Sequence, residues 1–323
     1  MPQDHHSDIL SKLTVQDAMR RLVVRLQAHV SIADAIRQMI RFKVNAVLVT
    51  DEKNEAVGVV SKTNILGAYY AYLPLVTPLS EVLVAPVLFC SPNDSLDKAL
   101  ERMRAHNVHR LYVAEQEIRG SRLVAGLLGA DPSRDSPSSL SRRAAGVLAY
   151  TDIAGLLYRY CHKCPRSTLR GTDPKSNQRL SDHLRVGEVM TASVLEHRES
   201  DLLGDVMESV FRERVRLALM RDEKGLPTGV ISTSDLIIAY LHGLPHEIPA
   251  REIMSQPVRG CEQNQPLEEA LQQMIFSDIQ SIFVYKHSPG NITGILSLSE
   301  VARARSGSCK ACLASRIQIE EPV

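Results

Sequence analysis

The sequence contains no tryptophan, and aromatic residues of all kinds make up only 4% of its 323 residues. Proteins that hold single-stranded nucleic acid usually stack its bases on aromatic side chains, so this scarcity argues against such a role. An excess of one charge is also missing, because 38 lysine and arginine residues against 37 acidic residues leave a formal net charge of +1. We therefore expect no nucleic-acid partner.

Long apolar runs are missing as well. The longest uncharged stretch, residues 63–80, includes Asn64, Pro74 and Pro78, which are unsuited to a membrane-spanning helix. The first residues contain neither a basic segment nor an apolar one, as an export signal would. The sequence predicts a cytoplasmic protein without a membrane partner.

The common catalytic signatures are absent too. There is no Gly-x4-Gly-Lys-Ser/Thr loop, no Gly-x-Gly-x-x-Gly turn, no His-Glu-x-x-His helix and no Gly-x-Ser-x-Gly elbow. Apolar residues at 44% and charged residues at 23% are ordinary for a folded globular chain. We expect a globular protein that is not an enzyme.

A short pattern occurs four times: an apolar residue, any residue, an acidic residue, an apolar residue, then Met or Leu. The four copies are Val15 to Met19, Leu79 to Leu83, Val186 to Met190 and Ala250 to Met254. The first two copies are 64 positions apart, the last two are also 64 apart, and 107 positions separate the middle two. The chain is therefore predicted to consist of two similar halves with two units each.

Each unit repeats one order of elements. An extended segment begins at Val23, Val87, Val194 or Val258, and an amphipathic helix with apolar side chains at i, i+3, i+4 and i+7 follows. Ser31, Ser95 and Asp201 are predicted to cap three of these helices, and Leu202, Val206 and Val210 form a thinner stripe on the third. Two strands and a closing helix complete each unit, and the second strand of each pair begins near Gly58, Gly146, Gly229 or Gly294.

The polar composition of two segments marks interruptions. Residues 130–143 hold five serines and two prolines and are predicted to be a disordered insertion, and residues 165–182 to be a polar linker. The predicted organisation is a unit at 13–73, a second at 77–160, a cysteine-containing linker at 161–184, a third unit at 185–243, a fourth at 248–305, and a tail at 306–323.

A unit that opens on an acidic-x-Met step and ends in Gly, two apolar residues, Ser or Thr, any two residues and then Asp resembles the cystathionine-β-synthase (CBS) domain. Four copies resemble the γ subunit of AMP-activated protein kinase and stand-alone bacterial CBS proteins. The resemblance implies an α/β fold of four tandem CBS repeats, in which each small sheet packs against helices. Paired repeats form a Bateman module, whose clefts often bind ligands that contain adenosine.

The ends of the units carry residues that suit such a ligand. A carboxylate can accept hydrogen bonds from both ribose hydroxyls, and a hydroxyl beside a helix N-terminus can help to hold a phosphate. The third unit has both, as Ser232 and Asp235, and is the best candidate. The fourth has Ser297 with Glu300, the second has Asp152 but Ala149 in place of the hydroxyl, and the first, the poorest, has Ser61 with Asn64. The alternative is that these residues only cap helices.

Positive charge for a phosphate is found in the second unit. His109 and Arg110 match the His-Arg pair that contacts nucleotide phosphates in the kinase γ subunit, as the resemblance implies. Arg214 and Arg216 lie near the corresponding strand of the third unit, one residue out of register with that pair. A solvated surface role is the alternative for these arginines.

Four of the six cysteines form two Cys-x-x-Cys hooks, Cys161 with Cys164 and Cys309 with Cys312. Each hook follows the closing helix of the second unit in its half, so a pseudo-two-fold arrangement would bring the hooks together. Four thiolates suit a zinc ion or an iron–sulfur cluster, within one chain or between two chains of a homodimer. Redox-active dithiols and no special role are the alternatives.

The sequence thus predicts a non-catalytic sensor that binds an adenine nucleotide (AMP, ADP or ATP) or a related adenosyl ligand and signals to an unidentified protein partner. One alternative is a metal or iron–sulfur sensor built on a CBS scaffold. The other is a structural assembly module with empty clefts.

Overall fold

The computed structural model describes residues 13–115, 142–163 and 185–303, without the side chains of residues 157–163. The predicted tail and nearly all of the predicted insertion and linker lie outside the described residues. No described helix has the length and apolar character needed to cross a membrane.

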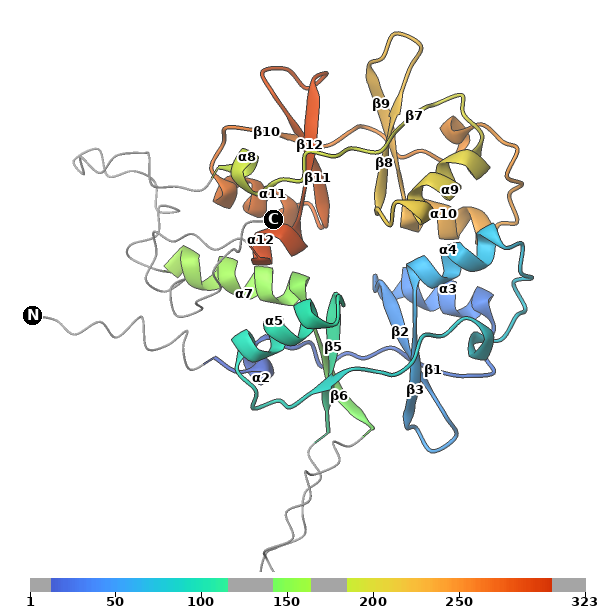
Figure 1. Ribbon diagram of the computed structural model, residues 1–323, viewed down its shortest axis with the longest axis vertical. Coiled ribbons are helices and arrows are strands. Elements are labelled where there is room, and N and C mark those ends of the chain that lie inside the picture. Colours follow the sequence, from blue (N-terminus) through green and yellow to red (C-terminus); the bar gives the residue numbers. More distant parts are fainter. Residues whose placement is uncertain (1–12, 116–141, 164–184, 304–323) are drawn as a thin grey trace, which may run out of the picture.

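Within the described residues, four three-stranded sheets follow one another along the chain, each with its own helices (Figure 1). The predicted α/β class with four repeats is confirmed. The first unit consists of α2 (Val15–Ala18), β1 (Arg25–Gln27), α3 (Ile32–Arg41), β2 (Ala46–Thr50), β3 (Ala56–Ser61) and α4 (Lys62–Tyr70). The second consists of η1 (Leu79–Glu81), β4 (Phe89–Cys90), α5 (Leu96–Ala105), β5 (Arg110–Ala114), β6 (Ala144–Ala149) and α7 (Tyr150–Lys163).

The second half repeats this order. The third unit consists of α8 (Val186–Val189), β7 (Glu196–Arg198), α9 (Leu203–Arg212), β8 (Leu217–Arg221), β9 (Pro227–Ser232) and α10 (Thr233–Leu241). The fourth consists of η3 (Ala250–Glu252), β10 (Gly260–Glu262), α11 (Leu267–Phe276), β11 (Ser281–Tyr285), β12 (Ile292–Ser297) and α12 (Leu298–Arg303). The opening strands start about two residues later than the valines that we expected to begin them.

Each sheet pairs its first two strands in parallel and its last two antiparallel, with a register shift at the end of the hairpin. Residues 115–143 join β5 to β6, where the other units have short turns, yet Ala114 still pairs with Ala144 after the same shift. The pairing of β5 with β6 is therefore the same as in the other units despite the longer connection.

Two of the three predicted caps of the amphipathic helices are present. Ser31 and Ser95 accept hydrogen bonds from the backbone N–H groups of Asp34 and Lys98, as expected. The predicted Asp201 cap is wrong, because α9 is preceded by Leu202, and Asp201 Oδ2 instead contacts His197 Nδ1 and accepts from Arg198 N–H. Consequently Leu202 is exposed, and the buried stripe of α9 is as full as the others: Leu203, Val206, Met207 and Val210.

The four units form a disc in which the two halves face each other (Figure 1). The first unit packs on the third through α4 and α10, and the second packs on the fourth through α7 and α12. One core cluster joins the first and third units and another joins the second and fourth. The core therefore crosses the boundary between the halves, and burial of apolar surface holds them together.

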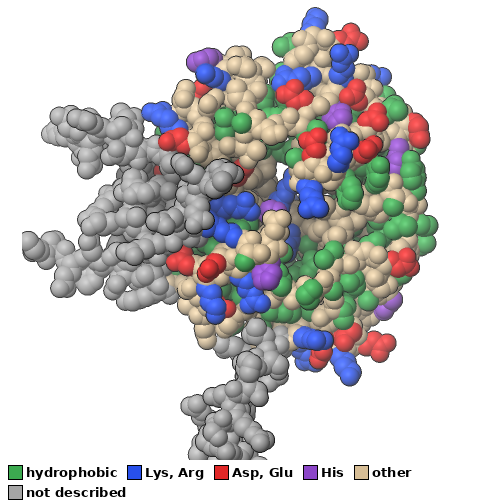
Figure 2. Space-filling model, viewed as in Figure 1, with side chains coloured by type: hydrophobic (Ala, Val, Ile, Leu, Met, Phe, Trp, Pro, Cys, Tyr) green, Lys and Arg blue, Asp and Glu red, His purple; other side chains and the backbone are tan. Residues whose placement is uncertain are grey.

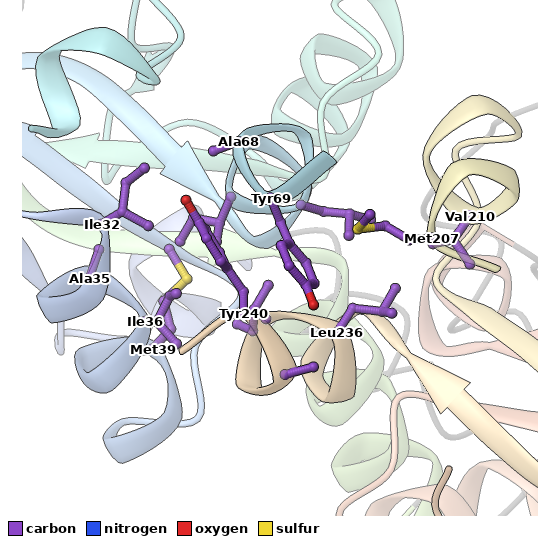
Figure 3. Packing of buried hydrophobic residues seen from close by; sticks show 14 of the residues in the cluster. Ile32, Ala35, Ile36, Met39, Ala68, Tyr69, Met207, Val210, Leu236 and Tyr240 are labelled. Atoms are coloured by element: carbon purple, nitrogen blue, oxygen red, sulfur yellow. The ribbon is translucent and has the colours of Figure 1, made fainter. Parts of the chain in front are cut away.

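Two tyrosines lie at the middle of the first of these clusters (Figure 3). The rings of Tyr69 on α4 and Tyr240 on α10 stack with centroids 4.6 Å apart. Each hydroxyl donates to a backbone carbonyl of the opposite half, Tyr69 to Leu244 at 2.7 Å and Tyr240 to Leu73. The exchange satisfies both buried hydroxyls and fixes α4 against α10.

Units of the same half are joined by a methionine or leucine that contacts a glycine. The Sδ atoms of Met254, Met19 and Met190 face Gly229, Gly146 and Gly294, and Leu83 faces Gly58. A Cβ atom on these glycines would lie 2.6 to 2.7 Å from an atom of the opening segment of the neighbouring unit. Only glycine permits this approach. The repeated Met/Leu position of one unit therefore contacts the repeated Gly position of its neighbour in the same half.

Candidate functional site

The predicted ligand residues lie at the beginning of the four closing helices, α4, α7, α10 and α12, which extend outward from the middle of the disc (Figure 1). In each unit one side-chain oxygen of the acidic or amide residue accepts from the backbone N–H three residues earlier. These donors are Ser61, Ala149, Ser232 and Ser297, at 2.5 to 2.8 Å. Each of these residues therefore caps its closing helix, as the alternative interpretation expected. The cap uses a single side-chain oxygen of each residue.

Asp235 shows what is left for a ligand. Its Oδ2 atom accepts from Ser232 N–H at 2.7 Å and from the Ser232 hydroxyl at 2.6 Å. Within the described ranges, its Oδ1 atom accepts only from the hydroxyl of Ser255, 3.1 Å away in the opening segment of the fourth unit. Ser255 is neutral and exposed, so a ligand hydroxyl can replace it at little cost.

The residue that follows Met or Leu in the opening segment takes the place of Ser255 in the other units. Thr191 donates to Glu300 Oε1 in the fourth unit, and Arg20 forms an ion pair with Asp152 in the second, with Nε 2.7 Å from Oδ1. In the first unit Val84 pairs with Val59 beside Asn64. The four positions therefore share a backbone geometry and differ in the group that faces the carboxylate or amide.

A cluster of cationic side chains lies around the middle of the disc: Lys62, His109, Arg110, Arg216 and Arg303, called here the central cluster. Figure 2 shows the disc hollowed in the middle, with Lys, Arg and His side chains gathered there. The members come from all four units, and several of them lower one another's pKa. These basic side chains give the middle of the disc a positive potential that attracts anions.

Lys62 extends the central cluster across the boundary between the halves. Its Nζ atom donates to the hydroxyl of Ser234, in the first turn of α10, at 2.7 Å. Burial lowers the pKa of Lys62, and the charges of Arg216 and Arg110 lower it further while Asp235 opposes them. A lysine from the first unit thus lies between the Asp235 carboxylate of the third unit and two arginines.

His109 is neutral in this surrounding. Desolvation lowers its pKa to about 4, and Arg216, Arg303 and Arg110 act in the same direction. His109 is nevertheless an exposed residue, and its ring lies 6.0 Å from that of Tyr150 between centroids. Protein atoms on the other sides remove most of its hydration, so exposure and a lowered pKa are compatible.

The charge of Asp152 partly offsets the lowering of the Arg110 pKa that burial causes, whereas no acidic residue of the described ranges acts on Arg216 in this way. In the described part of the chain, Arg110 and Arg216 make no hydrogen bond or ion pair, although both are partly buried and burial lowers both pKa values. Arg303 lies over the Tyr150 ring at 4.8 Å. Guanidinium groups held away from water without a counter-ion are unfavourable, and a bound anion removes this penalty.

The register of the sheets corrects the relation between the two basic pairs. Arg110 faces Ala149, and Leu217 faces Ser232 at the same point of the third sheet. Arg216 is therefore the counterpart of His109, not of Arg110, and Arg214 lies in the preceding turn with φ 54°. Of these two arginines, Arg216 belongs to the central cluster.

The sequence indicated Asp235, Ser232, His109 and Arg110 but gave no sign of Lys62 and Arg303. Lys62 follows Ser61 directly, yet the same position holds Tyr150, Thr233 and Leu298 in the other units. Because the repeat does not preserve the charge, only the folded disc shows that these residues meet.

The predicted metal site lies outside the described residues. Cys161 falls within α7, but its side chain is not described, and Cys164, Cys309 and Cys312 are not described at all. Among the described residues, no group of three or more histidine, cysteine or acidic side chains is placed to hold a metal ion. Cys90 and Cys261 are buried free thiols with pKa values raised to about 12 by burial.

Known proteins with this architecture are distant in sequence. Protein MJ1225 of Methanocaldococcus jannaschii, proposed to be an archaeal homolog of γ-AMPK, is 15% identical, with 90% of this chain and 99% of that chain covered and a TM-score of 0.67. The CBS domain protein PAE2072 of Pyrobaculum aerophilum, solved with AMP, is 23% identical over 36% of this chain and 89% of that chain, with a TM-score of 0.34. The first shows that the four-unit disc is a known fold.

An uncharacterized protein of Methanopyrus kandleri is 26% identical over 118 residues, which are 36% of this chain and 60% of that protein. The chain thus covers less than two thirds of this relative. The sequence profile of the CBS domain matches residues 15–71, 79–129 and 250–307. The third unit lies outside these ranges, but its sheet has the same strand order and pairing as the other three. The chain belongs to the CBS-domain family.

Proposed function

We propose that this protein is a non-catalytic sensor that binds an adenine nucleotide, with the ribose at Asp235 and the phosphates toward the central cluster. The observation that carries the proposal is the position of Asp235 beside Lys62 and near Arg216, which is partly buried and makes no hydrogen bond or ion pair within the described ranges. A nucleotide has two adjacent ribose hydroxyls and a chain of negative charges, and this site offers a carboxylate acceptor and a group of cations in the same order.

The third unit is the proposed main site because it alone combines the hydroxyl of Ser232, an aspartate and a neutral opening residue. The backbone carbonyl of Arg216 accepts from Thr233 N–H at 3.0 Å, which ties this arginine to the start of α10. Ribose and phosphate contacts therefore come from one unit, and Lys62 of the opposite half completes them. Binding across this boundary would stabilise one arrangement of the halves, which an unidentified protein partner could recognise.

Calorimetric titration with ATP, ADP, AMP and adenosine tests the proposal. Asp235→Asn places an amide at this position, as Asn64 does in the first unit. The amide keeps an oxygen that can cap α10 but removes the negative charge. A charge-assisted hydrogen bond is worth about 1.5–3 kcal/mol, so affinity should fall about 10- to 150-fold for every ligand that contains ribose.

Asp205→Asn is the matched control, because Asp205 occupies the same position in the first turn of α9 and is exposed. Its affinities should equal those of the wild type. An absence of binding heat for all four ligands, or equal affinities in Asp235→Asn and the wild type, would overturn the proposal.

A further inference from the structure

Asp152 is the counterpart of Asp235, but both of its carboxylate oxygens are occupied. Oδ2 accepts from Ala149 N–H at 2.8 Å, and Oδ1 is 2.7 Å from Arg20 Nε. The Asp152 side chain is 8% exposed, so this ion pair is largely shielded from water on the carboxylate side. In Asp235 the corresponding Oδ1 atom has only a serine hydroxyl.

The backbone fixes Arg20 in this position. Arg20 N–H donates to the Val147 carbonyl, and Val147 N–H donates to the Arg20 carbonyl, both at 2.9 Å. Gly146 allows the approach, since a Cβ there would lie 2.9 Å from the Arg20 carbonyl oxygen. The Arg20 side chain therefore starts from a backbone position that is held close to the strand before Asp152, while the side chain itself is 46% exposed.

We infer that Arg20 closes the Asp152 cleft to nucleosides, because it holds the carboxylate oxygen that a ribose would use. The inference rests on the proposed function for the meaning of a carboxylate at this point. A ribose hydroxyl is a neutral donor, and at a shielded carboxylate it replaces a guanidinium only at a loss. Arg20 is thus a residue that determines which clefts of the disc accept a nucleotide.

The opening residues make this a property of one cleft. Ser255 and Thr191 stand where Arg20 stands, and both are neutral hydroxyl donors that a ribose can replace. The clefts of the third and fourth units can therefore accept a ribose, whereas the Asp152 carboxylate of the second unit is already paired with Arg20. The Asp152 and Asp235 sites look equivalent by their local sequence. They differ because Arg20, more than a hundred positions before Asp152 in the chain, pairs with that aspartate.

Replacing Arg20 with the residue found at Ser255 tests the inference. The number of AMP molecules bound per chain is measured by calorimetry in the wild type and in Arg20→Ser. We expect one additional AMP per chain in Arg20→Ser, and we expect Arg20→Ser with Asp152→Asn to lose that gain. Arg21→Ser, which removes an exposed neighbouring charge, should bind as the wild type does, and so should Arg20→Lys, which keeps a cation at the pair.

The outcomes separate this inference from the proposed function. If the wild type binds AMP and Arg20→Ser binds no more, the inference is wrong and the proposed function stands. If only Arg20→Ser binds, the proposed function is wrong and the inference stands. If neither binds, both are wrong. Should Arg20→Ser unfold, the folded Arg20→Gln variant replaces it, with the same extra AMP expected, because glutamine carries no charge to hold Asp152.

Discussion

The two diagonals of the disc bring together the same structural position, the residue just before the middle strand, with opposite chemistry. On the diagonal between the first and fourth units, Asn45 donates from its side chain to Gln280 Oε1 at 2.7 Å, and Lys43 pairs with Asp278 nearby. On the other diagonal, His109 faces Arg216, and the charge of Arg216 lowers the His109 pKa. One diagonal is bridged by two complementary amides, and the other brings a neutral histidine near an arginine.

The two diagonals therefore differ in their roles, although the repeat places the same structural position on both. The amide pair satisfies its own donor and acceptor, so it needs nothing from outside. On the other diagonal, Arg216 makes no hydrogen bond or ion pair within the described ranges, so a bound anion would stabilise it. We interpret the first diagonal as the part that holds the disc closed, and the second as the part that a ligand completes.

The largest effect on ligand binding is expected when both diagonals are given the same chemistry. Arg216→Gln gives the cationic diagonal the amide that Gln280 provides on the other. Loss of a guanidinium contact to phosphate should weaken ATP binding about 10- to 150-fold and leave adenosine binding unchanged. Isothermal titration of both ligands measures this, with Arg212→Gln, an exposed arginine of α9, as control. Equal losses for ATP and adenosine would make Arg216 a packing residue.

Removing the amide pair should lower the stability of the protein and leave its affinity for ATP unchanged. In Asn45→Ala the Gln280 side chain loses its partner, so we expect a free energy of unfolding about 1 kcal/mol lower and ATP affinity close to that of the wild type. Urea unfolding followed by circular dichroism provides the first value and titration the second. Gln272→Ala, an exposed amide on α11, should change neither. A large loss of ATP affinity in Asn45→Ala would show that both diagonals bind ligand.

The histidine on the cationic diagonal predicts a pH dependence. Its pKa in the folded protein, about 4, lies below the ordinary value of 6.5, so the unfolded chain binds more protons between these values. Stability that depends on neutral His109 is therefore present above about pH 6.5 and is lost as the pH falls toward 4. The free energy of unfolding of His109→Gln should vary less steeply with pH over this window, by less than one proton. Equal slopes in the two proteins would contradict the lowered pKa.

The smallest effect is expected at the surface of the amide diagonal. Lys43 and Asp278 are 78% and 72% exposed, so their ion pair is screened by water and salt. Lys43→Ala should change the free energy of unfolding by about 0.5 kcal/mol or less. Unfolding at low and high salt measures this, and a loss above 1 kcal/mol would mean that the pair contributes to closing the disc.

The sequence was sufficient for the elements that a single unit determines. The i, i+3, i+4, i+7 pattern located the helices because each buries one apolar face in its own unit, and Ser31 and Ser95 cap locally. The prediction was wrong at Asp201, since a carboxylate that contacts His197 and Arg198 N–H is no longer free to cap α9. Local patterns do not show such competition among acceptors.

The site was predictable only in part, for a related reason. Asp235 and Ser232 are recognisable because ribose and phosphate chemistry needs them three residues apart at a helix start. Lys62 reaches Ser234 over 172 positions, and Arg20 reaches Asp152 from another unit. These contacts depend on how units pack, which no local spacing records. The cysteine hooks stay a prediction, because they lie outside the described residues.

The contact of each methionine or leucine with a glycine of the neighbouring unit also bears on how such a chain can be built. Leu83 fills the space above Gly58, while Met19 fills that above Gly146, so each unit of the first half lends a side chain to the other. A unit expressed alone would leave that hollow empty and its own methionine or leucine in water. The smallest piece of the chain in which these contacts are complete is therefore a pair of units.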